Sequence, residues 1–129
     1  MSISPWPISP LAEILEHLYE IERLRPNWDS YGSAAPTHVA VNAARDLIHN
    51  VCSGSLGEER AVPYAVAPLS GGGVQIEWRG DARAIEVEVR SEGALGYLLI
   101  RGREPSREFE EADHIPQSRV LELIRYVVS

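Results

Sequence analysis

Residues 74–90 read VQIEWRGDARAIEVEVR, and this stretch decides the fold. Apolar and polar residues alternate on both sides of a turn at Gly80-Asp81. Alternation with a period of two is typical of a β-strand that has one buried and one solvated face. Two such strands joined by a short turn form an antiparallel hairpin. We therefore predict strands over 74–78 and 83–90, whose core-facing residues are Val74, Ile76, Trp78, Ile85, Val87 and Val89.

Strand patterns continue on both sides of this hairpin. Residues 62–69 predict a strand that its two prolines confine to an edge or to bulges. Residues 95–100 predict a fourth strand. The charged segment 103–113, in which Phe109 is the apolar anchor, is compatible with a short fifth strand or a loop. The sequence thus predicts a four-stranded antiparallel meander with one buried face and one wet face.

Helical periodicity brackets the strands. The first helix starts at Ser9-Pro10, a residue pair typical of an N-cap and a first helical position, and it ends before Pro26. The second covers about 36–51, and the last follows Pro116. Two N-terminal helices and one C-terminal helix packed on one face of an antiparallel sheet give a two-layer α+β domain.

The length of 129 residues fits a single domain over 1–129. Pro5 and Pro7 flank Trp6, so we predict an extended arm over 1–9 that the indole docks onto the body. Apolar runs fall short of the ~20 residues that span a bilayer, and the start lacks the features of a signal peptide. We expect a cytoplasmic protein without a membrane segment.

The chain is acidic, with a formal net charge of -7 and a pI near 5.0. Nucleic-acid binding needs clustered cations, so direct binding of nucleic acid is not expected. All 12 basic residues are arginines, a bias typical of a GC-rich bacterial genome. Because lysine is absent, Schiff-base chemistry and a phosphate-binding P-loop are excluded.

Residue types for other chemistries are scarce or scattered. With Cys52 as its one cysteine, the chain has no partner cysteine for a disulfide or a thiolate zinc site. The four histidines lack metal-ligand spacing, and nothing singles out two of the 19 acids for catalysis. We therefore predict no catalytic residue, no metal and no cofactor, and we interpret the protein as non-enzymatic.

The most unusual stretch is the loop 27–32, which reads NWDSYG and places two aromatic residues among turn formers. Asp29 could cap a turn through its carboxylate, and Trp28 could fold into the core. The alternative is a recognition patch, since Trp and Tyr are typical anchors of protein interfaces. Glu77 likewise either faces solvent or pairs with an arginine or a ligand group.

Acidic residues also gather on the predicted wet face. Glu86 and Glu88 alternate with the core residues of their strand, and with Gln75 and Glu77 they give the sheet an acidic open face. That face, together with the acidic segment 104–113, is the best candidate in the sequence for contact with a basic partner. A merely solvated face is the alternative.

The segments 27–36, NWDSYGSAAP, and 72–78, GGVQIEW, resemble the paired motifs of a group of small bacterial proteins. That group combines an Asn-Trp-Asp-x-Tyr-Gly loop with a Gly-Gly-x-x-x-Glu-Trp strand. Ser33 stands where the group has alanine, and the resemblance spans about residues 18–100. It implies a connection with toxin–antitoxin, mobile-element or defence loci.

Because the two motifs belong to one signature, the resemblance also implies that they meet at one edge of the sheet. There a carboxylate would accept hydrogen bonds between two indole walls, or the two motifs would form a corner that locks the helices to the sheet. The candidate partner- or ligand-binding residues are Trp28, Asp29, Tyr31, Gly32, Glu77 and Trp78.

Three functions stay open on the sequence alone. The first is a protein-binding module, an accessory, antitoxin or immunity-type defence protein whose partner has a basic surface. The second is a small-ligand or nucleotide sensor that uses the corner lined by tryptophan and acid. The third is a divalent-metal hydrolase built from scattered carboxylates. A homodimer through an edge strand is also compatible with an open meander.

Overall fold

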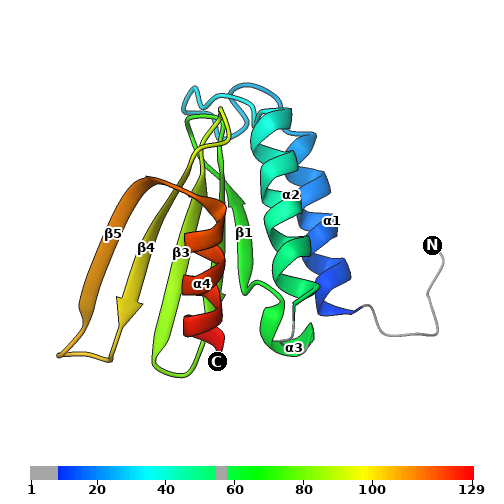
Figure 1. Ribbon diagram of the computed structural model, residues 1–129. Helices are drawn as coiled ribbons and strands as arrows, with labels where there is room; N and C mark the ends of the chain where they lie inside the picture. Colours follow the sequence, from blue (N-terminus) through cyan, green and yellow to red (C-terminus); the bar gives the residue numbers. More distant parts are fainter. Residues whose placement is uncertain (1–8, 55–57) are drawn as a thin grey trace.

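The computed structural model describes residues 9–54 and 58–129. Apart from Ser9, the predicted arm over 1–9 lies outside the described residues, and so does Trp6. Figure 1 shows the elements, which in chain order are α1 (Pro10–Glu22), α2 (His38–Cys52), α3 (Glu58–Ala61), β1 (Ala65–Pro68), β2 (Val74–Arg79), β3 (Arg83–Val89), β4 (Leu95–Arg101), β5 (Glu108–Ile115) and α4 (Gln117–Val128).

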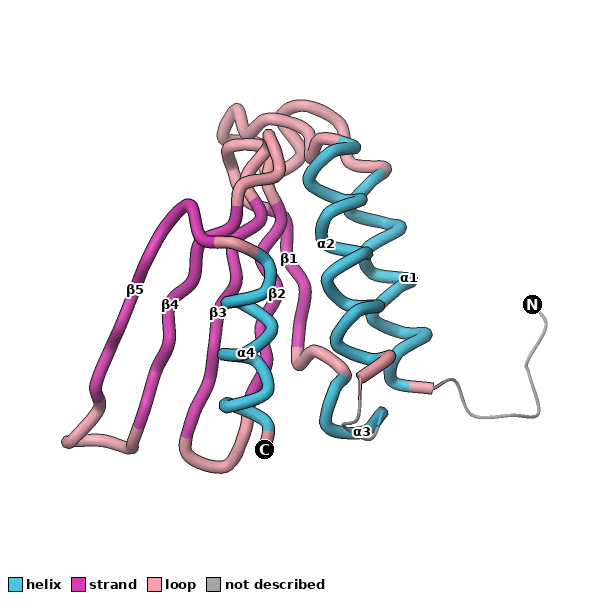
Figure 2. Tube along the Cα trace, in the orientation of Figure 1, coloured by secondary structure: helices cyan, strands magenta, loops and turns pink. Residues whose placement is uncertain are grey.

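The strands form one sheet in the order β1-β2-β3-β4-β5, and every neighbouring pair is antiparallel (Figure 2). The structure therefore confirms the α+β class and the antiparallel meander. The prediction of four strands is wrong, because β5 adds a fifth strand beside β4 in the described part of the chain. β5 is exposed at most of its positions, so both of its faces carry charged residues and no apolar alternation marks it in the sequence.

Helices α1 and α4 begin where the sequence predicts, and α2 begins at His38, slightly later than the expected start near residue 36. The Ser9 hydroxyl accepts a hydrogen bond from the Ala12 amide at 3.1 Å, and Thr37 caps α2 by accepting from the Ala40 amide at 3.0 Å. Both contacts satisfy amides that the first turn of a helix leaves without partners. The first helix ends at Glu22, earlier than the Pro26 boundary that the sequence suggests.

The segment before the sheet differs from the prediction. The short helix α3 precedes the sheet, and β1 begins at Ala65 rather than at residue 62. Proline lacks an amide hydrogen, so Pro63 cannot donate to a strand ladder. The Tyr64 amide is the first to bond across, donating to the Glu77 carbonyl at 2.7 Å.

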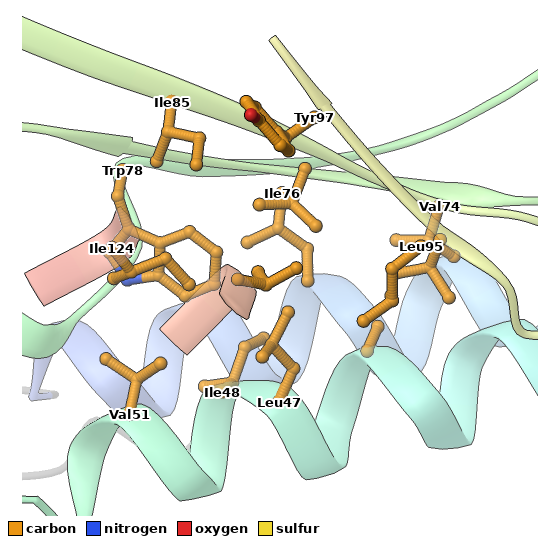
Figure 3. Close-up of a cluster of buried hydrophobic side chains, with 14 of the residues drawn as sticks. Leu47, Ile48, Val51, Val74, Ile76, Trp78, Ile85, Leu95, Tyr97 and Ile124 are labelled. Carbon is orange, nitrogen blue, oxygen red and sulfur yellow. The ribbon is translucent and has the colours of Figure 1, made fainter. Parts of the chain in front are cut away.

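The buried residues of β2 and β3 share one face of the sheet, and helices α1, α2 and α4 contact the strands. Figure 3 shows side chains of α2 and α4 that pack against side chains of β2, β3 and β4. All six core-facing residues predicted from the central hairpin are fully buried there: Val74, Ile76, Trp78, Ile85, Val87 and Val89. Within the described residues, no helix combines the length and apolarity that a membrane crossing needs.

Candidate functional site

The Asn27–Gly32 loop is closed by its own hydrogen bonds. The Asn27 side-chain oxygen accepts from the Gly32 amide at 2.7 Å, and the Asn27 amide donates to the Ser33 carbonyl at 2.8 Å. Asn27 and Ser30 both adopt left-handed backbone conformations with φ of 66°. Asparagine visits this region readily, which explains its place at the start of the loop.

Both carboxylate oxygens of Asp29 accept hydrogen bonds from residues that follow it in the chain. One oxygen accepts from the amides of Tyr31, at 3.0 Å, and Ser33, at 3.4 Å, and the other accepts from the Ser33 hydroxyl. The hydroxyl of Ser33, followed by the amide of Tyr31, holds the pKa of Asp29 below its usual value. The carboxylate is therefore a structural acceptor, as the turn-capping alternative predicts.

The two aromatic residues of the loop have different surroundings. Trp28 is half-buried, and its indole Nε1 donates to the Ala34 carbonyl at 3.0 Å. Tyr31 is 91% exposed, so nearly its whole ring faces solvent at the loop tip. Gly32 has φ of 79°, and a Cβ there would meet no atom within 4 Å. Its glycine is thus required by backbone conformation rather than by crowding.

The loop fastens to the turn between β1 and β2. The Ala34 amide donates to the Ser70 carbonyl at 2.9 Å, and the Thr37 amide donates to the Gly72 carbonyl at 3.0 Å. The Thr37 hydroxyl also donates to the Ser91 carbonyl at 2.6 Å. The loop that contains the first motif therefore does meet the second motif, 72–78, but at Gly72, where the second motif begins.

Glu77 and Trp78 lie toward the other end of β2. A strand rises about 3.3 Å per residue, so Trp78 stands roughly 13 Å along the strand from Val74. In Figure 1 the loop after α1 is at one end of the sheet, while α3 and the end of α4 are at the other. The indole Nε1 of Trp78 donates to the Ala61 carbonyl of α3 at 2.8 Å.

The expected corner that joins Trp28 and Asp29 to Glu77 and Trp78 is therefore not formed. Trp78 is fully buried and offers no surface to a partner. Glu77 forms an ion pair with Arg79, whose guanidinium stacks 3.5 Å from the centroid of the Tyr64 ring. The sequence could not show that the segment 27–36 lies against Gly72, at the start of the second motif, and not against Glu77 and Trp78 at its end.

Replacing Asp29 with asparagine should lower the melting temperature near neutral pH and have no effect in strong acid. The folded-state pKa of Asp29 is depressed, so its stabilisation is present above the unfolded pKa and is lost as pH falls through the folded pKa. Thermal melts from pH 7 down to about 2 would check this, with the unfolded value near 3.9. Parallel curves for the two proteins at every pH would contradict it.

The second candidate region is the face of the sheet that points away from the core. The strand register sets side chains on it in three cross-strand rows. The middle row is Ala65, Glu77, Glu86, Leu98 and Glu111; the flanking rows are Arg79, Ala84, Ile100 and Phe109, and Ala67, Gln75, Glu88 and Gly96. We call these residues, with Arg90 and Asp113, the open face.

A hollow of about 440 Å³ lies in the open face, over β3, β4 and β5. Leu98 and Gly96 contribute to its lining, and its carboxylates are Glu86, Glu88, Glu111 and Asp113. A Cβ on Gly96 would stand 2.7 Å from a carboxylate oxygen of Asp113. The shape of the hollow therefore depends on a glycine in β4, beside the register shift between Leu95 and Tyr97.

One arginine balances only part of this charge. The Arg90 Nη2 lies 2.7 Å from Asp113 and 3.3 Å from Glu88. Desolvation raises the pKa of Asp113, but the hydrogen bond and charge of Arg90 outweigh it and leave that pKa below its usual value. Among the described residues, Glu86 and Glu111 make no ion pair. The hollow thus keeps an excess of negative charge around an apolar floor.

The sequence identified this acidic face but missed its apolar part. Ile100 and Phe109 are directly opposite each other on β4 and β5, and Phe109 is 62% exposed. Leu98 lies between Glu86 and Glu111. Phe109, the apolar anchor of the charged segment 103–113, is the one sequence signal that made a strand there conceivable.

Replacing Glu86 with glutamine should stabilise the protein, because Glu77 and Glu86 are directly opposite on neighbouring strands. Like charges in this position are destabilising, and cross-strand pairs are worth about 0.2–1 kcal/mol. The expected gain in the free energy of unfolding is of that size. Urea denaturation at low and high salt would measure it, and the gain should shrink as salt screens the repulsion. A loss of stability at low salt would refute the explanation.

The described residues contain no group of three His, Cys, Asp or Glu side chains placed to hold a metal ion. In comparisons with known proteins, no family model matches the chain, and no curated protein or solved structure shows significant similarity to it.

Proposed function

We propose that this chain is a non-enzymatic protein-binding module whose open face receives a partner with a basic surface. The observation that carries the proposal is the hollow of about 440 Å³, which combines four carboxylates with an apolar floor. Interfaces commonly set apolar contacts within a polar rim, and charge complementarity steers the two partners together. The proposal takes the domain as two-layered, with its helices on one face of the sheet.

The like-charge pair of Glu77 and Glu86 gives independent support. Glu86 stands directly opposite Glu77, a like-charge position that is expected to cost stability, and a basic partner would remove the repulsion on binding. On the sequence resemblance, we propose an accessory, antitoxin or immunity-type role in the cytoplasm. The ligand-sensor alternative loses its support, because the corner that it needs is not formed.

Peptide selection can test the proposal without knowledge of the natural partner. A random peptide library displayed on phage is panned against the wild type, against Glu86→Arg and against Glu16→Arg. Glu16 is exposed on α1, so its substitution changes the net charge equally but leaves the open face intact. Wild type and Glu16→Arg should enrich peptides that combine arginine or lysine with apolar residues, and Glu86→Arg should not.

Two results would overturn the proposed function. The first is enrichment of no basic peptide by the wild type. The second is equal capture of the same peptides by Glu86→Arg and wild type, which would place the contact elsewhere on the molecule. Circular dichroism of each variant shows whether it is folded before panning.

A further inference from the structure

The two edges of the sheet differ in their ability to accept another strand. β1 has four residues, ends in a proline and is packed against α1. β5 has eight residues, contains no proline and is exposed at most of its positions. A short, proline-bearing edge is protected against further pairing, whereas a long edge presents a row of unpaired backbone groups. β5 is therefore the edge at which backbone hydrogen bonding can continue.

The side chains of β5 select what can add there. Glu108, Glu110, Glu111 and Asp113 make the strand acidic on both faces, and Phe109 is its large exposed apolar residue. Two copies of β5 placed side by side would set like charges against each other, which disfavours a homodimer at this edge. A basic strand would meet opposite charges at the same positions.

Two carboxylates of β5, those of Glu108 and Glu110, are held from the side of β4. The Tyr97 hydroxyl donates to Glu110 at 2.6 Å, and Arg101 lies 3.6 Å from Glu110 and 3.8 Å from Glu108. The hydrogen bond from Tyr97, ahead of the charge of Arg101, lowers the pKa of Glu110. Ordered carboxylates need little further immobilisation when a partner binds, so less entropy is lost.

We propose that β5 accepts an extended basic segment of the partner as an added antiparallel strand. In this arrangement basic residues stand opposite Glu108, Glu110, Glu111 and Asp113, and an apolar residue stands opposite Phe109. Side chains directly opposite on antiparallel strands are about 4.5–5.5 Å apart at Cβ, close enough for these pairs to form. The proposal rests on the proposed function, because it states how the basic partner engages the acidic sheet.

The test uses the full chain and a synthetic peptide that reads Arg-Ala-Arg-Arg-Val-Arg between threonines, the antiparallel complement of residues 108–113. Two further peptides carry N-methyl groups on every second residue. One is methylated at the odd-numbered positions of the peptide and the other at the even-numbered positions. An added strand donates only every second amide to the edge, so methylation of one set should block binding and methylation of the other should not. All three peptides carry the same charge.

We expect the parent peptide to shift the amide NMR signals of β5 and β4, and one methylated peptide to bind at least about tenfold more weakly than the other. Equal binding of the two methylated peptides would show charge attraction without strand addition and overturn the inference. Shifts confined to the open face away from β5 would do the same, while leaving the proposed function standing. A dimer through β5 in size-exclusion chromatography would also overturn it, since the edge would then be occupied by a second copy.

Discussion

Replacing Trp78 with alanine is expected to lower the free energy of unfolding by about 3–5 kcal/mol, the range found for tryptophan or phenylalanine removed from a core. Trp78 is 0% exposed and lies between the sheet and the helices (Figure 3). Its loss leaves a cavity and also removes the indole donor from the Ala61 carbonyl of α3, a residue that is itself buried. The Ala61 carbonyl then keeps the weaker Cys52 thiol donor, at 3.7 Å, but loses the stronger indole donor, which adds to the cost.

The matched control is Trp28→Ala, which removes the same side chain from a half-buried position. Its indole donates to a carbonyl of the exposed residue Ala34, which water can satisfy after the substitution. Urea denaturation of the three proteins should show a much lower midpoint for Trp78→Ala than for Trp28→Ala, with similar m-values. Equal midpoints would mean that the burial of Trp78 does not govern stability.

Gly73→Ala should destabilise the protein by about 1–3 kcal/mol or more, as expected when a core contact is overpacked. A Cβ at this position would lie 2.3 Å from the carbonyl oxygen of Val89, which belongs to the backbone of β3. Because a backbone carbonyl cannot turn aside as a flexible side chain does, β2 and β3 would have to separate at this end.

Gly71→Ala is the control from the same turn, since a Cβ there meets no atom within 4 Å. This second alanine should leave the melting temperature nearly unchanged, because nothing in the structure opposes the added methyl group. Thermal unfolding followed by circular dichroism distinguishes the two variants. If both variants lost a similar amount of melting temperature, the cause would be the flexibility of glycine in the turn and not the contact of the new methyl group with β3.

The sequence predicts elements whose residues repeat a period and have a single buried face. β2 and β3 show this, because each alternates strictly between core and open face, and every residue assigned to the core is buried. The cap Ser9 was also evident, since a hydroxyl before a helical pattern acts within one turn. Thr37 was predicted to open the second helix, and the structure shows it to be the cap.

Two kinds of feature could not be predicted from the sequence. One depends on contacts between residues that are distant in the chain, and the other is a strand whose two faces are both exposed. β5 has no buried face, so only its pairing with β4 reveals it. The register that sets Glu77 opposite Glu86 follows from the length of the turn between them, and the hollow at Gly96 follows from a local shift in pairing. The candidate site was thus predicted as an acidic face, without its apolar floor.

The hydrogen bonds that Thr37 makes to two turns of the sheet have a consequence for how the molecule opens. The residue joins the start of α2 to the turn before β2 and to the turn after β3, at Gly72 and Ser91. Helix ends ordinarily fray with little free energy, and their amides exchange with solvent quickly. Here fraying would require two turns of the sheet to part as well. Amide hydrogens at the start of α2 should therefore exchange as slowly as those in the middle of the sheet, so that helix and sheet open as one cooperative unit.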